Sequence, residues 1–94
     1  MPYYVYILAS KKNGTLYIGS TSDLVKRVWQ HKKKVIPGFT SRYNVVSLVY
    51  FEQFDDVYEM AHRERRMKEW QRKSKIRIIE QKNPQWQDLF NTIC

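Results

Sequence analysis

Apolar and polar positions near the N-terminus follow the pattern of β-strands. Residues 3–9 (YYVYILA) are aromatic and β-branched, which favours a strand. Asn13 and Gly14 tolerate positive φ and predict a turn. Residues 15–20 (TLYIGS) then return as a second strand. The first twenty residues therefore predict a β-hairpin.

A helical period begins after the hairpin. Its apolar positions are Leu24, Val25, Val28 and Trp29. Ser22 is the expected N-cap, and Asp23 lies in the first turn, where an acid suits the helix dipole. We expect this helix to end near Lys33. Residues 34–44 contain Pro37 and Gly38 and are interpreted as a loop.

The third predicted strand covers residues 45–52 (VVSLVYFE). It is apolar on both faces and is therefore expected to be central in the sheet or covered on both sides. Asp55 or Asp56 then caps a long helix that continues to about Lys73.

The remaining residues predict two more helices. Ser74 opens the first of them, and Asn83 followed by Pro84 is typical of the start of a short terminal helix. The predicted order is ββαβααα. We interpret residues 1–94 as one α+β domain, with a three-stranded antiparallel sheet flanked by helices.

Charge narrows the choice of partners. Lys and Arg number 17 against 9 Asp and Glu in 94 residues, a formal net charge of +8. This excess favours a polyanion, nucleic acid before an anionic membrane surface, although solubility alone also explains charge. No apolar run approaches the roughly 20 residues that a membrane span needs. No signal peptide is evident and Cys94 is the single cysteine, so we expect a cytoplasmic protein without disulfides.

Two tyrosines are candidates for chemistry. Tyr6 and Tyr17 lie on the same sheet face if the hairpin loop has an even number of residues, such as two or four. Two phenols there would position a water or a phosphate oxygen. The alternative is that both rings simply pack, as tyrosine does in many strands.

A cation and an imidazole form a second candidate pair. Arg27 and His31 are four residues apart, so they share one helix face beside the apolar stripe. Together they would grip a phosphate, the guanidinium as a fixed fork and the imidazole as a proton carrier. The alternative is an ordinary solvated face.

One acid occupies a position where the helical period asks for an apolar residue. The stripe of the long helix reads Val57, Met60, Ala61, Glu64 and Met67. A carboxylate there needs a cation or strong donors, which suggests a function for Glu64. Pairing with an arginine, or a rotated stripe that exposes Glu64, would explain it structurally. No phosphate-binding glycine loop occurs, and His31 and His62 lie on different helices, which argues against a zinc site.

These residues, in this order, resemble the GIY-YIG nuclease superfamily. The resemblance covers about Tyr3 to Leu89 and is closest to compact single-domain bacterial proteins akin to the nuclease module of the bacterial excision-repair nuclease. The matching segments are Tyr4-Val5-Tyr6, Tyr17-Ile18-Gly19, Asp23 to His31, Ala61-His62-Arg63-Glu64, Lys68-Glu69-Trp70, and Asn83-Pro84 with Trp86. Each motif is weak alone, and the ordered set is strong.

The resemblance implies a metal-dependent nuclease, with DNA repair as a related process. Glu64 would hold one divalent ion, Mg²⁺ or Mn²⁺, and Arg27 would neutralise charge on the phosphate. Tyr6 would orient the attacking water or take its proton, although an unperturbed phenol with a pKa near 10 is a poor base at neutral pH. Tyr17 and His31 would complete the hydrogen-bonded shell.

Two positions depart from the family pattern or match it weakly. Tyr4 replaces the glycine that names the first motif, which changes one strand face but keeps the phenol of Tyr6. The family's downstream asparagine matches only Asn83, which a helix cap explains equally well. Gly19 fits its place, because the absence of a Cβ lets substrate approach.

We therefore expect an endonuclease that acts on DNA, or on RNA, and recognises structure rather than base sequence. The substrate-binding residues expected from the sequence are Gly19, Lys32, Lys33, Arg42 and Asn83. A groove would contact the phosphate backbone through Lys11, Lys12, Arg27, Lys32, Lys33, Arg42, Arg63, Arg66 and Arg72. The main alternative is a non-catalytic nucleic-acid-binding module, and a third is an interaction domain whose aromatic residues only pack.

Overall fold

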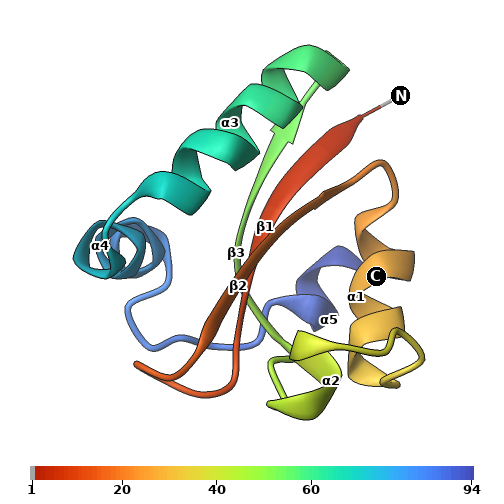
Figure 1. The fold of residues 1–94 in the computed structure, drawn as a ribbon, viewed down its shortest axis with the longest axis vertical. Helices are drawn as coiled ribbons and strands as arrows, with labels where there is room; N and C mark the ends of the chain where they lie inside the picture. The colour runs from red at the N-terminus through yellow and green to blue at the C-terminus, as the bar shows by residue number, and fades with distance from the viewer. Residues whose placement is uncertain (1) are drawn as a thin grey trace.

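A three-stranded antiparallel sheet organises the protein, as described for residues 2–94 in a computed structural model (Figure 1). The strands are β1 (Tyr3–Ala9), β2 (Leu16–Thr21) and β3 (Ser47–Phe54). Their order in the sheet is β2-β1-β3, so the hairpin is formed as predicted and β1 is central. The predicted α+β class and antiparallel sheet are confirmed.

Five helices cover the two faces of this sheet. They are α1 (Leu24–Lys32), α2 (Phe39–Arg42), α3 (Val57–Glu69), α4 (Arg72–Lys82) and α5 (Phe90–Ile93). Figure 1 shows α3 and α4 on one side of the sheet and α1, α2 and α5 on the other. No helix among residues 2–94 combines the length and the apolar character that a membrane crossing requires.

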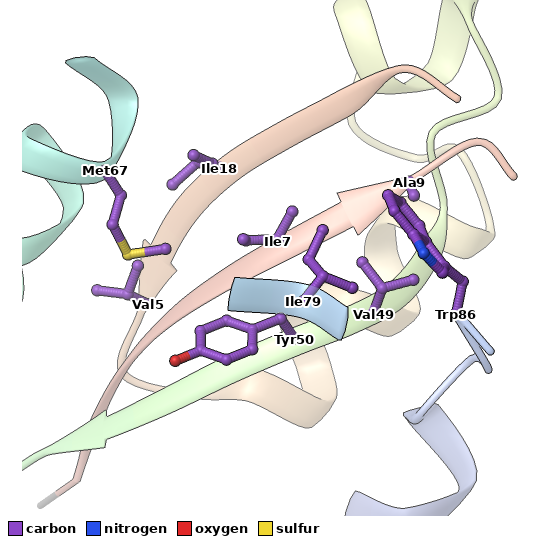
Figure 2. Close-up of a cluster of buried hydrophobic side chains, with 9 residues drawn as sticks. All are labelled: Val5, Ile7, Ala9, Ile18, Val49, Tyr50, Met67, Ile79 and Trp86. Carbon is purple, nitrogen blue, oxygen red and sulfur yellow. The ribbon is translucent and has the colours of Figure 1, made fainter. Parts of the chain in front are cut away.

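Each face of the sheet has its own hydrophobic core. The core beneath α3 and α4 contains Val5, Ile7, Ala9, Ile18, Val49, Tyr50, Met67, Ile79 and Trp86 (Figure 2). The core on the α1 side contains Tyr6, Leu8, Leu24, Val28, Val45 and Leu48. Successive residues of β1 point alternately into the two cores, which is why this strand is apolar along almost its whole length.

The third strand is covered but not central. Leu48 packs in one core and Val49 in the other, so the expected burial on both faces is confirmed. The central position expected as an alternative is wrong, because β3 lies at an edge and pairs with β1 alone. Its pairing with β1 is irregular between Ile7 and Leu8.

Two predictions around α1 are corrected. Asp23, not Ser22, is the N-cap, because its Oδ1 accepts a hydrogen bond from the backbone N–H of Lys26 at 3.1 Å. The predicted loop contains the one-turn helix α2, which begins after Gly38 at a φ of 123°. The observed order is therefore ββααβααα, with one helix more than predicted.

The C-terminal helices also begin and end differently from the prediction. Asp56 caps α3, one of the two residues expected, but α3 ends at Glu69 and α4 already begins at Arg72. Asn83 is the C-cap of α4 and does not start a helix; the short terminal helix begins only at Phe90. Asn83 does not start a helix because its side chain hydrogen-bonds to backbone groups of Val49 and Gln87.

Candidate functional site

Tyr6 and Tyr17 project from the same face of the hairpin. Ala9 pairs with Leu16, which leaves residues 10–15 as an even-numbered loop. Tyr6 then pairs with Gly19 and Tyr17 pairs with Leu8, so the two phenols share the face that α1 covers. Their ring centroids lie 6.4 Å apart. The predicted same-face arrangement is confirmed.

His31 reaches this pair of phenols from the last turn of α1. Its Nε2 lies 3.0 Å from the Tyr6 hydroxyl, and its ring centroid lies 5.6 Å from that of Tyr17. The helix presents Leu24, Val28 and His31 to the core, and His31 is 2% exposed. His31 therefore lies within the buried stripe, which corrects the expectation that it only adjoins it.

Gly19 leaves room for the Tyr6 phenol. A Cβ at this position would lie 2.6 Å from the Tyr6 hydroxyl oxygen and 3.0 Å from Cε2 of Tyr17. Such distances are shorter than van der Waals contact, so any side chain here would displace the phenol. The glycine of the second motif is thus required by the packing of both tyrosines.

Burial and the Arg27 guanidinium shift the pKa values of Tyr6 and His31. Burial raises the pKa of Tyr6 to about 12, against the positive charge of Arg27, which acts to lower it. Burial and the same guanidinium lower the pKa of His31 below its usual 6.5. Arg27 and His31 therefore both lie near the phenol of Tyr6. His31 is neutral at pH 7 in this environment.

Glu64 approaches the site around the outer strand β2. Ser20 faces away from the phenols, because it pairs with Val5 on the side that α3 covers. Its hydroxyl donates to Oε1 of Glu64 at 2.6 Å, and Nζ of Lys68 lies 2.9 Å from Oε2. Burial acts to raise the pKa of Glu64, but Ser20 and Lys68 outweigh it and hold that pKa below 4.5.

The stripe of α3 is rotated from the one expected. Val57 is 39% exposed and Ala61 is exposed, whereas Met67 is buried. The Glu64 side chain is 21% exposed. The predicted apolar environment of Glu64 is therefore only partial. Of the three arginines of α3, Arg63 is paired with Glu52.

The five candidate residues lie on the two sides of β2. The phenols, His31 and Arg27 lie on one side of this strand, and Glu64 lies at its other side. Glu64 is still close enough to influence the pKa of Tyr6. Within residues 2–94, no group of three or more His, Cys, Asp or Glu side chains is placed to hold a metal ion. Glu64 is the carboxylate that the site offers.

Three of the nine basic residues expected in the groove are engaged within the fold. Lys32 is paired with Asp88, and Arg63 donates to both oxygens of Glu52 at 2.9 and 2.8 Å. Arg72 donates to the carbonyls of Asn13 and Gly14 and so fixes the hairpin loop.

Other basic residues remain on the surface. Lys11, Lys12, Lys33, Arg42 and Arg66 are exposed. Arg66 borders a surface hollow on α3 together with His62, Arg65, Glu69 and Trp70.

Asn83 is occupied inside the protein. It is 6% exposed, and its Nδ2 donates to the carbonyls of Val49 and Gln87 at 3.1 and 2.8 Å. Its Oδ1 accepts from the backbone N–H of Gln87 at 3.0 Å. These bonds tie the C-terminal segment to β3, so the expected role of Asn83 as a substrate contact is wrong.

Three polar residues that contact the candidate site residues were not predicted from the sequence. Strand alternation identifies Ser20, because it places the Ser20 side chain on the other sheet face from Gly19, toward α3. The i,i+4 spacing from Glu64 identifies Lys68. Thr40, whose Oγ1 lies 3.0 Å from Nδ1 of His31, belongs to a segment interpreted as a loop, and no local pattern identifies it.

Known proteins share both the sequence pattern and the fold. Residues 2–77 match the family described as the GIY-YIG catalytic domain. A UPF0213 protein of Pediococcus pentosaceus is 36% identical over 77 residues, which are 82% of this chain and 80% of that protein. One from Clostridium perfringens is 38% identical over 80 residues, or 85% of each. The solution structure of a Bacillus halodurans UPF0213 protein has a TM-score of 0.58 and 27% identity, covering 94% and 93% of the two chains.

Proposed function

The chain belongs to the GIY-YIG family together with the bacterial UPF0213 proteins, and we propose on this basis that it is an endonuclease that hydrolyses phosphodiester bonds in DNA. The observation that carries the proposal is the cluster of Tyr17, His31 and Arg27 around the buried Tyr6, with Glu64 on the other side of the same strand. Structural roles alone do not require a phenol, an imidazole, a guanidinium and a carboxylate around one glycine.

Each side chain has a role in this proposal. Arg27 neutralises the charge that develops on the phosphate, as a guanidinium does for phosphoryl oxygens. Tyr6 takes the proton of the attacking water, and His31 holds the phenol in place. Tyr17 is partly exposed and completes the hydrogen-bonded shell toward the substrate.

Glu64 is the residue that would hold a divalent ion. Mg²⁺ is commonly bound by one or two carboxylates, with water and substrate phosphates as the remaining ligands, so a single partly exposed carboxylate fits. Oε2 now faces the exposed ammonium of Lys68, which a bound ion would displace. When bound, Mg²⁺ or Mn²⁺ supplies Lewis-acid polarisation of a phosphoryl oxygen.

Charge and exposed aromatic rings support a nucleic-acid substrate. The net charge is +8, and the exposed basic side chains on the surface are suited to phosphate contacts that read no bases. Phe39 and Tyr43 on α2 are exposed, and their ring centroids lie 5.0 Å apart. Exposed rings beside basic residues are typical of surfaces that stack unpaired bases. We therefore propose recognition of structure rather than sequence; cytoplasmic location stays a prediction.

A non-catalytic nucleic-acid-binding module is the second candidate. One observation favours it: Tyr6 is 1% exposed, so its phenol lies behind the surface. In such a protein the same fold and charge would bind DNA while the buried tyrosine and histidine only pack.

Cleavage assays separate the two functions. Branched, single-stranded and duplex DNA are incubated with Mg²⁺, with Mn²⁺ and with EDTA. The proposal expects cleavage of at least one substrate with metal and none with EDTA. Equal cleavage in EDTA would contradict the use of a divalent ion. Binding of all three DNAs without cleavage would replace the nuclease with the binding module.

A further inference from the structure

Three buried polar side chains from three elements form one hydrogen-bonded chain. Tyr6 of β1, His31 of α1 and Thr40 of α2 are 1%, 2% and 5% exposed. The Tyr6 hydroxyl lies 3.0 Å from Nε2 of His31, and Nδ1 lies 3.0 Å from Oγ1 of Thr40. Thr40 is thus the part of α2 that contacts the site.

The proposed chemistry fixes the direction of these hydrogen bonds, because each hydroxyl can donate or accept. A phenol that takes the proton of water must release its own, and Nε2 of His31 lies at hydrogen-bond distance from it. The Tyr6 hydroxyl therefore donates to Nε2. A neutral imidazole has one donor and one acceptor, so Nδ1 carries the proton that Oγ1 of Thr40 accepts.

We propose, on the basis of the nuclease function above, that Thr40 is a positioning residue that holds His31 in its Nδ1–H tautomer and thereby makes Nε2 the acceptor of the Tyr6 hydroxyl proton when Tyr6 takes a proton from water. The oxygen of water forms a bond to phosphorus and its proton passes to the Tyr6 oxygen. The original hydroxyl proton of Tyr6 passes to Nε2, giving an imidazolium. The bond from phosphorus to the leaving oxygen breaks, and that oxygen takes a proton from solvent.

This relay resolves a difficulty in the chemistry of Tyr6. A phenol whose pKa is raised to about 12 is protonated at neutral pH and accepts a proton only if it loses its own at once. His31 is neutral at pH 7 and can take that proton. The ionisable groups that face His31 are Tyr6 from β1, Tyr17 from β2 and Arg27 from its own helix.

The tautomer is measurable by ¹⁵N NMR of the imidazole rings. The chain has two histidines, and His62 is exposed on α3, so it serves as an internal reference. At neutral pH we expect His31 of the wild type to show a protonated Nδ1 and an unprotonated Nε2. Thr40→Val should lose this single-tautomer pattern, and Thr40→Ser should restore it. A wild-type Nε2–H tautomer, or an unchanged His31 pattern in Thr40→Val, would overturn the proposal.

Cleavage kinetics test the relay itself. Thr40→Val should lower kcat by about tenfold or more, approaching the roughly 10²–10⁴-fold cost of losing a general base, with little change in KM and with recovery in Thr40→Ser. An unchanged kcat in a Thr40→Val protein whose tautomer has changed would overturn the relay while the nuclease function stands. A wild type that cleaves nothing would refute the nuclease and the relay together, whereas the NMR pattern decides the positioning role independently.

Discussion

The phenol of Tyr6 owes its surroundings to residues that are far apart in the sequence. Gly19 leaves the space for its hydroxyl, Nε2 of His31 lies at hydrogen-bond distance from it, and Arg27 lies nearby. Tyr6 and His31 are buried and their pKa values are shifted, so their ionisation is coupled to folding. The properties of single residues are therefore visible in the stability of the protein as well as in its activity.

His31 predicts a window of pH-dependent stability. Burial lowers its pKa in the folded protein, so between that pKa and the usual 6.5 the unfolded chain binds more protons. This contribution is complete above about pH 6.5 and is lost as pH falls toward the folded pKa. His31→Gln should flatten the fall in the urea midpoint between pH 7.5 and 5.5. His62→Gln, on the exposed face of α3, should keep the wild-type curve. Parallel curves for wild type and His31→Gln would contradict this.

Glu64 predicts a small structural cost when it is replaced. Its pair with Lys68 is a partly exposed i,i+4 contact, which contributes little. Glu64→Gln should therefore change metal-free stability by less than about 1 kcal/mol. It should also remove any rise in Tm caused by Mn²⁺, since that rise requires binding to the folded state.

The matched control for Glu64→Gln is a variant of the other ion pair of α3, between Arg63 and Glu52. Arg63→Met leaves the half-buried Glu52 without its guanidinium and should cost about 2 kcal/mol, because an uncompensated carboxylate is expensive. Thermal melts of the three proteins with and without Mn²⁺ compare these effects. A large metal-free loss in Glu64→Gln, or an equal Mn²⁺ stabilisation of wild type and Glu64→Gln, would assign Glu64 to the fold.

Among the elements, those with a sustained period could be predicted from the sequence. Alternation identified the hairpin and placed Tyr6 and Tyr17 on one face, and helical spacing identified α1 and α3. The burial of His31 could not be predicted, because a polar histidine beside an apolar stripe gives no sign that it belongs to the buried face. Asn83 was misinterpreted because its bonds to Val49 and Gln87 depend on tertiary structure that the Asn-Pro pattern does not contain.

Helix α2 was missed because four residues are too few to show a period. Thr40 of this helix is buried, whereas Phe39 and the C-cap residue Tyr43 are exposed by 47% and 52%. The exposed rings therefore lie close in the chain to the residue that contacts His31. The element thus links the buried site to a surface suited to base stacking.

The aromatic pair of α2 should contribute to binding of single-stranded DNA. Stacking contributes about 1–3 kcal/mol per base, so Phe39→Ala with Tyr43→Ala should raise Kd by roughly 5- to 150-fold. Duplex DNA, whose bases are not free to stack, should be affected less. Tyr58→Ala is the control, because Tyr58 is 81% exposed on α3. Fluorescence anisotropy measures all three proteins. Equal losses in the double variant and in Tyr58→Ala would contradict a specific stacking surface.

At the scale of the whole molecule, where the net charge is +8, the basic side chains fall into two groups. Lys32, Arg63 and Arg72 are bound to acids or carbonyls within the fold. Within residues 2–94, no ion pair joins Lys33 or Arg42 to an acid. Composition alone gives the total charge, but only the fold distinguishes cations that stabilise the structure from those available to phosphate.

This division predicts different salt dependences for two arginines. Binding to DNA should weaken steeply with salt, because each neutralised phosphate releases counterions. Arg42→Ala should reduce the slope of log K against log salt by about 0.7–0.9, the value for one lost contact. Arg72→Ala should leave the slope unchanged, since its guanidinium already binds the carbonyls of Asn13 and Gly14. Filter-binding titrations decide this, and a flat wild-type dependence would contradict the phosphate-contact surface altogether.

The central claim is that Tyr6 and Glu64, on opposite sides of β2, act in one hydrolytic site. Single-turnover cleavage by wild type, Tyr6→Phe, Glu64→Gln and the double variant tests it most directly. Residues that act in the same step are strongly non-additive. Each single variant should lose at least about 10²-fold in rate, and the double variant should be no slower than the slower single variant. A near wild-type rate in Tyr6→Phe, or losses that multiply in the double variant, would show that the two residues do not form one active site.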